Sequence, residues 1–147
     1  MKPIQYIAEN HRDTLWGLTV CSVGYQKVFP GENYPPCGHN NEYLFSPTKG
    51  RILQEYQLLY IVSGQGTLTT QCNGTQTINA GDMFLLFPGE WHTYSPDTDT
   101  GWEEYWIGFQ GSNIDHRVKA GFFSPESPLY HIGYNERITD LYRDAIH

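Results

Sequence analysis

Runs of apolar and β-branched residues alternate with turn-forming residues along most of the chain, from Trp16 to Gly111. The runs are short, and glycine, proline or asparagine separates most of them. Many short strands with closely spaced turns are typical of a β-sandwich or a β-barrel. The strands predicted by this pattern are Trp16–Val23, Glu42–Phe45, Arg51–Val62, Thr67–Cys72, Thr75–Ile78, Met83–Phe87, Trp91–Tyr94 and Trp102–Phe109.

One turn and two helices can be predicted in more detail. Asn73-Gly74 lies between two of these strands and predicts a type I′ hairpin turn. After the last strand, Ser112 and Asp115 have the spacing of a capping box, so a short helix is expected over Asn113–Ala120. Asn135 is expected to cap a second helix. Its apolar residues recur at helical spacing and predict one buried face, made of Ile138, Leu141, Tyr142, Ala145 and Ile146.

Composition and charge exclude several classes of protein. The chain has 147 residues, the size of one domain, which buries roughly 70% of the surface of its unfolded state. Nine Lys and Arg against sixteen Asp and Glu give a net charge of −7, which argues against binding to nucleic acid or to a membrane surface. Neither a membrane span nor a signal peptide is recognisable, so we expect a cytoplasmic protein. The three cysteines, Cys21, Cys37 and Cys72, are expected to be free thiols.

The segment Gly81–His92 resembles the second conserved motif of the cupin barrel. A glycine turn leads into a buried strand, Pro88-Gly89 turns the chain, and a histidine follows. Metal-binding cupins have a first motif with two further histidines, whereas the matching segment Arg51–Gly66 has none. Its nearest substitutes are Glu55 and Gln57, and a metal site normally needs three or more protein ligands. We therefore expect no metal and no other cofactor.

Two more segments, Glu55–Gly66 and Gly101–Phe109, resemble the N-terminal sensing domain of AraC-type transcriptional regulators. The resemblance implies a cupin-like double-stranded β-helix, an all-β jelly-roll barrel followed by C-terminal helices. It also implies a small effector in the barrel, often a sugar, and a homodimer in the full-length protein, with DNA contacted only through a C-terminal domain outside this chain. The implied organisation is an arm over residues 1–15, the barrel over 16–111, and a helical extension over 112–147 that begins the dimerisation region.

The resemblance also implies the residues of a binding pocket. Along Trp102–Phe109, strand periodicity leaves open which face lies inside the barrel, because both faces carry aromatic residues. In the sugar-responsive relatives, the residues that match Glu104 and Trp106 point inward, although their prototype has a histidine in place of Glu104. A Trp face, a carboxylate and a guanidinium suit a polyol. The predicted ligand-binding residues are Arg51, Tyr94, Glu104, Trp106 and His92.

Three alternatives remain open from the residues alone. In the first, Trp106 fills the core, Glu104 lies on the surface and Arg51 makes an exposed ion pair. In the second, bulky side chains such as Phe84 fill the barrel, which then senses nothing. In the third, the chain is a stand-alone, metal-dependent cupin enzyme, a sugar isomerase or a dioxygenase, with His92 as a ligand.

Overall fold

A computed structural model describes residues 4–6, 16–34 and 46–147 of the chain. The expected strand over residues 42–45 and most of the expected arm lie outside the described residues. Within them, nine strands and two helices occur in the order β1 (Ile4–Tyr6), β2 (Thr19–Val28), β3 (Arg51–Ile52), β4 (Tyr56–Thr70), β5 (Gly74–Asn79), β6 (Asp82–Leu86), β7 (Trp91–Pro96), β8 (Trp102–Gln110), α2 (Ser112–Lys119), β9 (Leu129–His131) and α3 (Glu136–Ile146).

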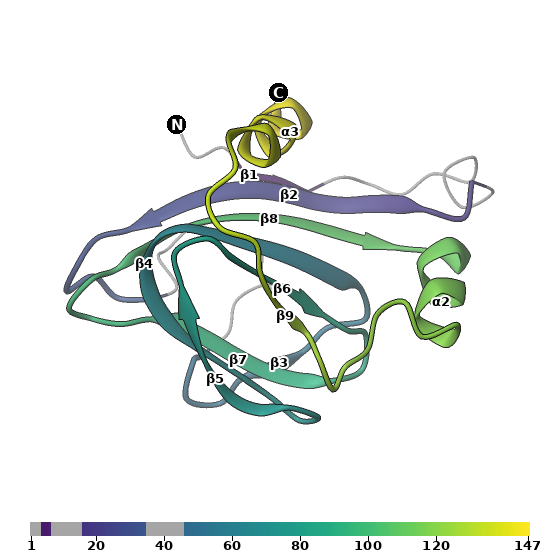
Figure 1. The fold of residues 1–147 in the computed structure, drawn as a ribbon, viewed down its shortest axis with the longest axis horizontal. Helices are drawn as coiled ribbons and strands as arrows, with labels where there is room; N and C mark the ends of the chain where they lie inside the picture. The colour runs from purple at the N-terminus through teal and green to yellow at the C-terminus, as the bar shows by residue number, and fades with distance from the viewer. Residues whose placement is uncertain (1–3, 7–15, 35–45) are drawn as a thin grey trace.

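The strands form a double-stranded β-helix in which the long strand β4 belongs to two walls (Figure 1). The first half of β4 pairs with β8 and β6 in a sheet of order β1-β2-β8-β4-β6-β9, and its second half pairs with β5 and β7. The register with β8 shifts between Ile61 and Ser63, and Gly64 follows with φ of 84°. A side chain at Gly64 would lie 2.0 Å from the Gly101 carbonyl oxygen, so only glycine permits this bend. The predicted fold, a cupin-like barrel followed by C-terminal helices, is confirmed.

Three local predictions need correction. The predicted strand Arg51–Val62 is interrupted after Ile52, and β4 then runs from Tyr56 through residues 63–66 to Thr70, so the predicted strand Thr67–Cys72 is its second half. The first long strand begins at Thr19 rather than Trp16, because residues 16 and 17 form a turn, and it continues to Val28. The hairpin at Asn73-Gly74 is present, but its turn is not type I′. Thr70 pairs with Gly74, so the loop has three residues, and Asn73 lacks the positive φ that a type I′ turn requires.

The two helices begin differently. Asn135 caps α3 as predicted, because its side-chain oxygen accepts a hydrogen bond from the Arg137 amide at 2.9 Å. The capping box predicted for α2 is wrong. Gly111 is the N-cap there, and the Asp115 carboxylate accepts a hydrogen bond from the Tyr56 hydroxyl instead, at 2.8 Å. The tie to Tyr56 holds α2 against the end of the barrel.

The fold buries three clusters, one of which lies beside α2 and consists of Tyr56, Leu85, Phe87 and Ile114. The inner cluster, inside the barrel, consists of Val28, Leu59, Ile61, Leu68, Ile78, Phe84, Leu86, Tyr94, Trp102 and Trp106. The outer cluster lies between the sheet and α3 and consists of Val23, Tyr60, Tyr105, Tyr142 and Ile146. Thr139 is also buried on α3, whereas two predicted core residues are exposed, Ala145 and Leu141, the latter by 68%.

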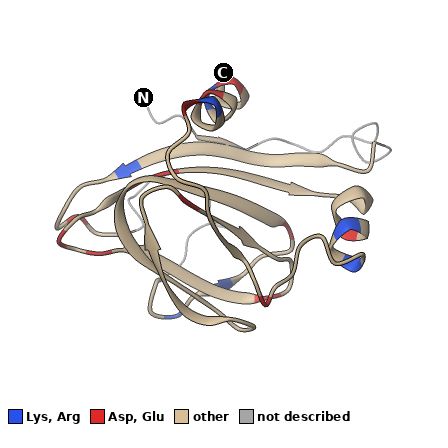
Figure 2. Cartoon of the chain, viewed as in Figure 1, with Lys and Arg blue, Asp and Glu red and all other residues tan. Residues whose placement is uncertain are grey.

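Charged residues are concentrated at the periphery of this fold. Figure 2 shows mostly uncharged strands, with charged residues gathered on α2, on α3 and at strand ends and loops. The charged residues on strands include Lys27 on β2, Arg51 on β3, and Glu103 and Glu104 on β8. In the described part of the chain, neither helix is long and apolar enough to cross a membrane.

Candidate functional site

Alternate side chains of β8 point into the barrel, and they are those of the face that carries Trp102, Glu104 and Trp106. Trp102 and Trp106 belong to the inner cluster, and Glu104 lies between them with only 3% of its surface exposed. Tyr94, from β7, is in the same cluster. The alternative that leaves Glu104 on the surface is therefore wrong. Three of the sequence-predicted residues, Tyr94, Glu104 and Trp106, lie inside the barrel.

Arg51 reaches the same interior from β3, where it pairs with His92 of β7. Its Nε donates to His92 Nε2 at 3.0 Å, and its terminal nitrogen donates to the Tyr94 hydroxyl at 2.8 Å and to Gln57 Oε1 at 3.4 Å. The guanidinium also lies 5.5 Å from the centre of the Tyr94 ring. These contacts hold the guanidinium in one orientation, which is the condition for forked recognition of a ligand.

His92 is fully buried and works as an acceptor for Arg51. Burial, followed by the charge of Arg51, lowers the pKa of His92 to about 3, and an interaction with the Glu90 backbone opposes this shift without reaching full hydrogen-bond geometry. The imidazole is therefore neutral near pH 7. Because Arg51 can only donate, Nε2 must be the acceptor and Nδ1 carries the proton.

A permanent cation at His92 Nε2 opposes a metal ion at the same nitrogen. Among the described residues, no group of three or more His, Cys, Asp or Glu side chains is placed to hold a metal. The interior polar groups are instead suited to hydrogen bonding with a neutral or polar ligand.

Glu104 is the acidic counterpart of Arg51 in this interior. Its carboxylate accepts hydrogen bonds from the Tyr34 hydroxyl, at 3.1 and 3.0 Å to its two oxygens, and from Gln26 Nε2 at 3.2 Å. Burial raises the pKa of Glu104 to about 7, against the lowering effects of Tyr34, the Trp102 indole and the charge of Arg51. The Trp102 N–H interacts with the carboxylate but falls short of full hydrogen-bond geometry.

Trp106 is positioned by a close approach to strand β2. Gly24 pairs with Trp106, and a side chain at Gly24 would lie 2.4 Å from the indole ring. The indole therefore occupies the space that any other residue at position 24 would fill. This packing fixes the plane of Trp106, which is 5% exposed, within the barrel wall.

Sequence reasoning missed two residues of this site and misjudged a third. Gln26 faces Glu104 in the strand register, which is readable only once the pairing of β2 with β8 is known. Tyr34 lies beyond the end of β2, in a segment whose proline and glycine content predicts a loop and no more. Gln57 was considered only as a substitute metal ligand, and it instead accepts a hydrogen bond from Arg51.

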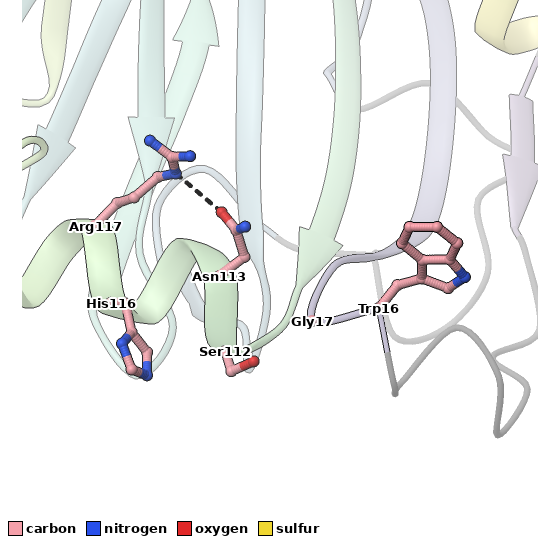
Figure 3. Close-up of a pocket in the computed structure, with 6 residues that line it drawn as sticks. All are labelled: Trp16, Gly17, Ser112, Asn113, His116 and Arg117. Atoms are coloured by element: carbon pink, nitrogen blue, oxygen red, sulfur yellow. Dashed lines mark hydrogen bonds between the residues drawn. The ribbon is translucent and has the colours of Figure 1, made fainter.

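A hollow lies outside the barrel, at the start of α2 (Figure 3). It is a shallow, open concavity of about 390 Å³ between Trp16 and the first turns of the helix. The Arg117 guanidinium donates to Asn113 Oδ1 at 2.9 Å across one side of it, and both side chains are exposed. None of the predicted ligand-binding residues lines this hollow, so the barrel interior remains the candidate site.

Fold and site together define a class of protein: a cupin-like barrel whose interior holds buried aromatic and polar side chains. The family described as "AraC-like ligand binding domain" matches residues 30–146, which is most of the chain. The chain therefore belongs to the AraC-like ligand binding domain family.

Three curated relatives resemble parts of the chain. The raffinose operon transcriptional regulatory protein of Pediococcus pentosaceus is 34% identical over 91 residues, covering 61% of this chain and 33% of the relative. The Msm operon regulatory protein of Streptococcus mutans is 38% identical over 78 residues, covering 52% and 26%. The lactose operon transcription activator of Staphylococcus xylosus is 30% identical over 93 residues, covering 61% and 32%. The matched segments thus span a third or less of each of these regulators.

A solved structure shares the fold. The protein YhaK of Escherichia coli superposes with a TM-score of 0.51 at 12% sequence identity, covering 76% of this chain and 45% of that one. At this identity the likeness concerns the fold alone, and it agrees with the cupin-like barrel described above.

Proposed function

We propose that the chain is the effector-sensing and dimerisation domain of a sugar-responsive transcriptional regulator. In this proposal the barrel, residues 16–111, is not an enzyme, and effector binding shifts the population between two arrangements of the segments attached to it. DNA binding belongs to the part of such regulators that the matched segments do not cover. A regulator of this kind acts on DNA in the cytoplasm.

The observation that carries this proposal is the pairing of Arg51 and Glu104 with two tryptophans inside one barrel. The carboxylate accepts from a tyrosine hydroxyl and the guanidinium donates to another, so both groups already make the hydrogen bonds that a polyol offers. An indole face suits the apolar C–H face of a pyranose ring. A buried carboxylate is costly, and a binding role explains why it is present.

The proposed effector class is a sugar with a galactose unit. Two of the relatives carry raffinose and lactose in the names of their operons. Both of these sugars contain a galactopyranose, which presents several hydroxyls on one face and a patch of C–H groups on the other. Raffinose and lactose are therefore the first probes to use.

Isothermal titration of the purified protein with raffinose and with lactose tests the proposal. We expect binding of at least one sugar, and we expect Glu104→Gln to weaken it by about 1–3 kcal/mol, because the amide accepts hydroxyl hydrogens less strongly than the carboxylate does. Glu103→Gln is the matched control, since Glu103 is the next residue on the strand and faces outward, where Tyr25 donates to it. Equal losses in both variants, or no binding of any sugar tested, would contradict the proposed site.

The proposed dimer uses the exposed side of α3. Ile138, Leu141 and Ala145 border a groove of about 300 Å³ between the helix and the sheet, and its lining is almost entirely apolar. A second copy of the chain is the proposed occupant, because the same helix face on two copies is self-complementary. Leu141→Lys is expected to lower self-association in sedimentation velocity. Leu141 is 68% exposed in the monomer, so this change leaves the barrel folded. Equal sedimentation coefficients for the wild type and Leu141→Lys at every concentration tested would contradict this interface.

A further inference from the structure

Tyr34 enters the barrel from the loop that follows β2. The base of this loop is fixed at the rim, because the Glu32 amide donates to the Phe29 carbonyl at 3.1 Å and the Gly31 amide donates to the Thr98 carbonyl at 2.9 Å. Tyr34 lies two residues beyond this anchored turn and packs against the inner cluster. Its side chain is thus delivered into the interior by a loop rather than by a strand of the wall.

The phenol of Tyr34 lies among the residues that are proposed to hold the effector. Its hydroxyl is within 3.1 Å of both Glu104 oxygens. Its ring centre is 6.0 Å from that of Trp102, which it meets edge-on at 88°, and 6.2 Å from that of Tyr94. One side chain therefore offers a hydroxyl to the buried carboxylate and an apolar ring to the aromatic wall. These are the two kinds of contact that a sugar ring would make there.

We propose that Tyr34 is a displaceable internal occupant of the effector site. In the free protein its phenol satisfies Glu104 and covers Trp102, and a sugar takes over both contacts when it binds. This proposal rests on the proposed function, because it assumes that the barrel is the effector site.

Internal occupancy has two physical consequences. A carboxylate buried without a donor is costly, so Tyr34 stabilises the free barrel, and the effector must compete with it. Ligands that cannot both donate to Glu104 and cover Trp102 are then rejected, which makes Tyr34 a determinant of specificity. Displacement of Tyr34 also moves the loop at residues 29–34, so effector binding changes the conformation of the barrel rim.

The first experiment requires no effector. Tyr34→Ala removes the phenol, and p-cresol, which is the tyrosine side chain as a free molecule, is the probe. We expect millimolar p-cresol to raise the melting temperature of Tyr34→Ala by several degrees and to leave the wild type unchanged, because the wild-type site is filled. Toluene, which lacks the hydroxyl, should raise it less. Tyr25→Ala, which opens the outer face, should not respond. Absence of this rescue in a folded Tyr34→Ala protein overturns the proposal.

The second experiment measures sugar binding and uses a variant that keeps the ring. Tyr34→Phe removes only the hydroxyl, whose one hydrogen is shared between the two Glu104 oxygens, so raffinose or lactose should bind on the order of tenfold more tightly than to the wild type. Tyr25→Phe is the matched control, because the Tyr25 hydroxyl also donates to a carboxylate, that of Glu103 at 2.9 Å on the outer face. Weaker binding to Tyr34→Phe overturns the proposal, since Tyr34 would then contact the bound sugar directly.

The two experiments also separate this proposal from the proposed function. Rescue by p-cresol together with no sugar binding in any variant refutes the sugar effector and leaves the internal occupant supported. Sugar binding without rescue, and with equal affinity for Tyr34→Phe and the wild type, refutes the internal occupant and supports the sugar effector. Should Tyr34→Ala fail to fold, the affinity of Tyr34→Phe alone decides the matter.

Discussion

Each face of β8 carries a glutamate, and the two carboxylates differ in burial and in their hydrogen-bond partners. On the outer face, Glu103 accepts from the Tyr25 hydroxyl at 2.9 Å and from the Ser63 hydroxyl at 3.2 Å, and Lys27 lies 3.6 Å away. On the inner face, burial raises the pKa of Glu104 to about 7, although Tyr34 donates to it. The two carboxylates are adjacent in sequence but differ in solvent access, since Glu103 is 25% exposed and Glu104 only 3%.

Neighbouring polar groups follow the same division. Under α3, the Tyr142 hydroxyl donates to the Leu58 carbonyl, and the Tyr60 hydroxyl donates to the Gly133 carbonyl and accepts from the Asn135 amide. Inside the barrel, Trp102 Nε1 and His92 Nδ1 are buried without a full hydrogen bond in the described part of the structure. The hydrogen bonds of the outer face are thus complete, whereas these two donors of the inner face make only distorted ones, with Glu104 and with the Glu90 backbone.

The largest expected effect comes from the outer face. Tyr142→Ala removes a ring that is 7% exposed and packs against Tyr105, and it leaves the Leu58 carbonyl without its donor. We expect a loss of about 3–5 kcal/mol in the free energy of unfolding, measured by urea denaturation. Leu141→Ala, one residue away on the exposed side, is the control and should cost less than about 1 kcal/mol. Similar losses in both variants would mean that α3 presents a different face to the sheet.

On the inner face, Glu104 should make the free energy of unfolding depend on pH. The pKa of Glu104 is raised from an ordinary 4.5 to about 7, so its contribution to stability is complete below pH 4.5 and is lost as the pH rises through 7. The difference in free energy of unfolding between the wild type and Glu104→Gln isolates this contribution, since the amide does not titrate. The wild type should lose about 3 kcal/mol relative to the variant across this interval. If the difference in free energy of unfolding between the wild type and Glu104→Gln stays constant with pH, the pKa of Glu104 is not raised by burial.

The smallest expected effect compares the two helix starts. Asn135→Ala removes the side-chain acceptor that caps α3 and should cost about 1 kcal/mol. Ser112→Ala should be nearly neutral, because α2 has no side-chain cap bond. Thermal unfolding of both variants measures this difference. A larger loss for Ser112→Ala would restore the capping box that the sequence predicts.

Most of the fold was predictable because its signals are local. Alternation and turn residues located the strands of the barrel, and Asn135 located the start of α3. Type I′ geometry failed at Asn73 because loop length, and not the residue pair, determined the turn. Leu141 was misplaced because helical periodicity identifies an apolar stripe but not which edge of the stripe meets the sheet.

The site was less predictable, because its contacts join residues that are distant in sequence. Glu104 and Tyr34 are 70 positions apart, and Arg51 and Tyr94 are 43 apart. Family resemblance selected Arg51, Tyr94, Glu104, Trp106 and His92, and the structure brings them together in the barrel, while their role in binding stays a prediction. Gln26 and Tyr34 carried no local signal, because their importance arises only from strand register and from the path of a loop.

Strand β2 lies between β8 on one edge and β1 on the other, and α3 packs against it (Figure 1). Gln26 touches Glu104 on the inside, while β1 pairs with β2 at Gly24 and the side chain of Gln5 donates to the Ile146 carbonyl at the end of α3. At this point the barrel wall consists of one strand, β2. The contact with Glu104 and the pairing with β1 are therefore made by the same strand, with no other element between them.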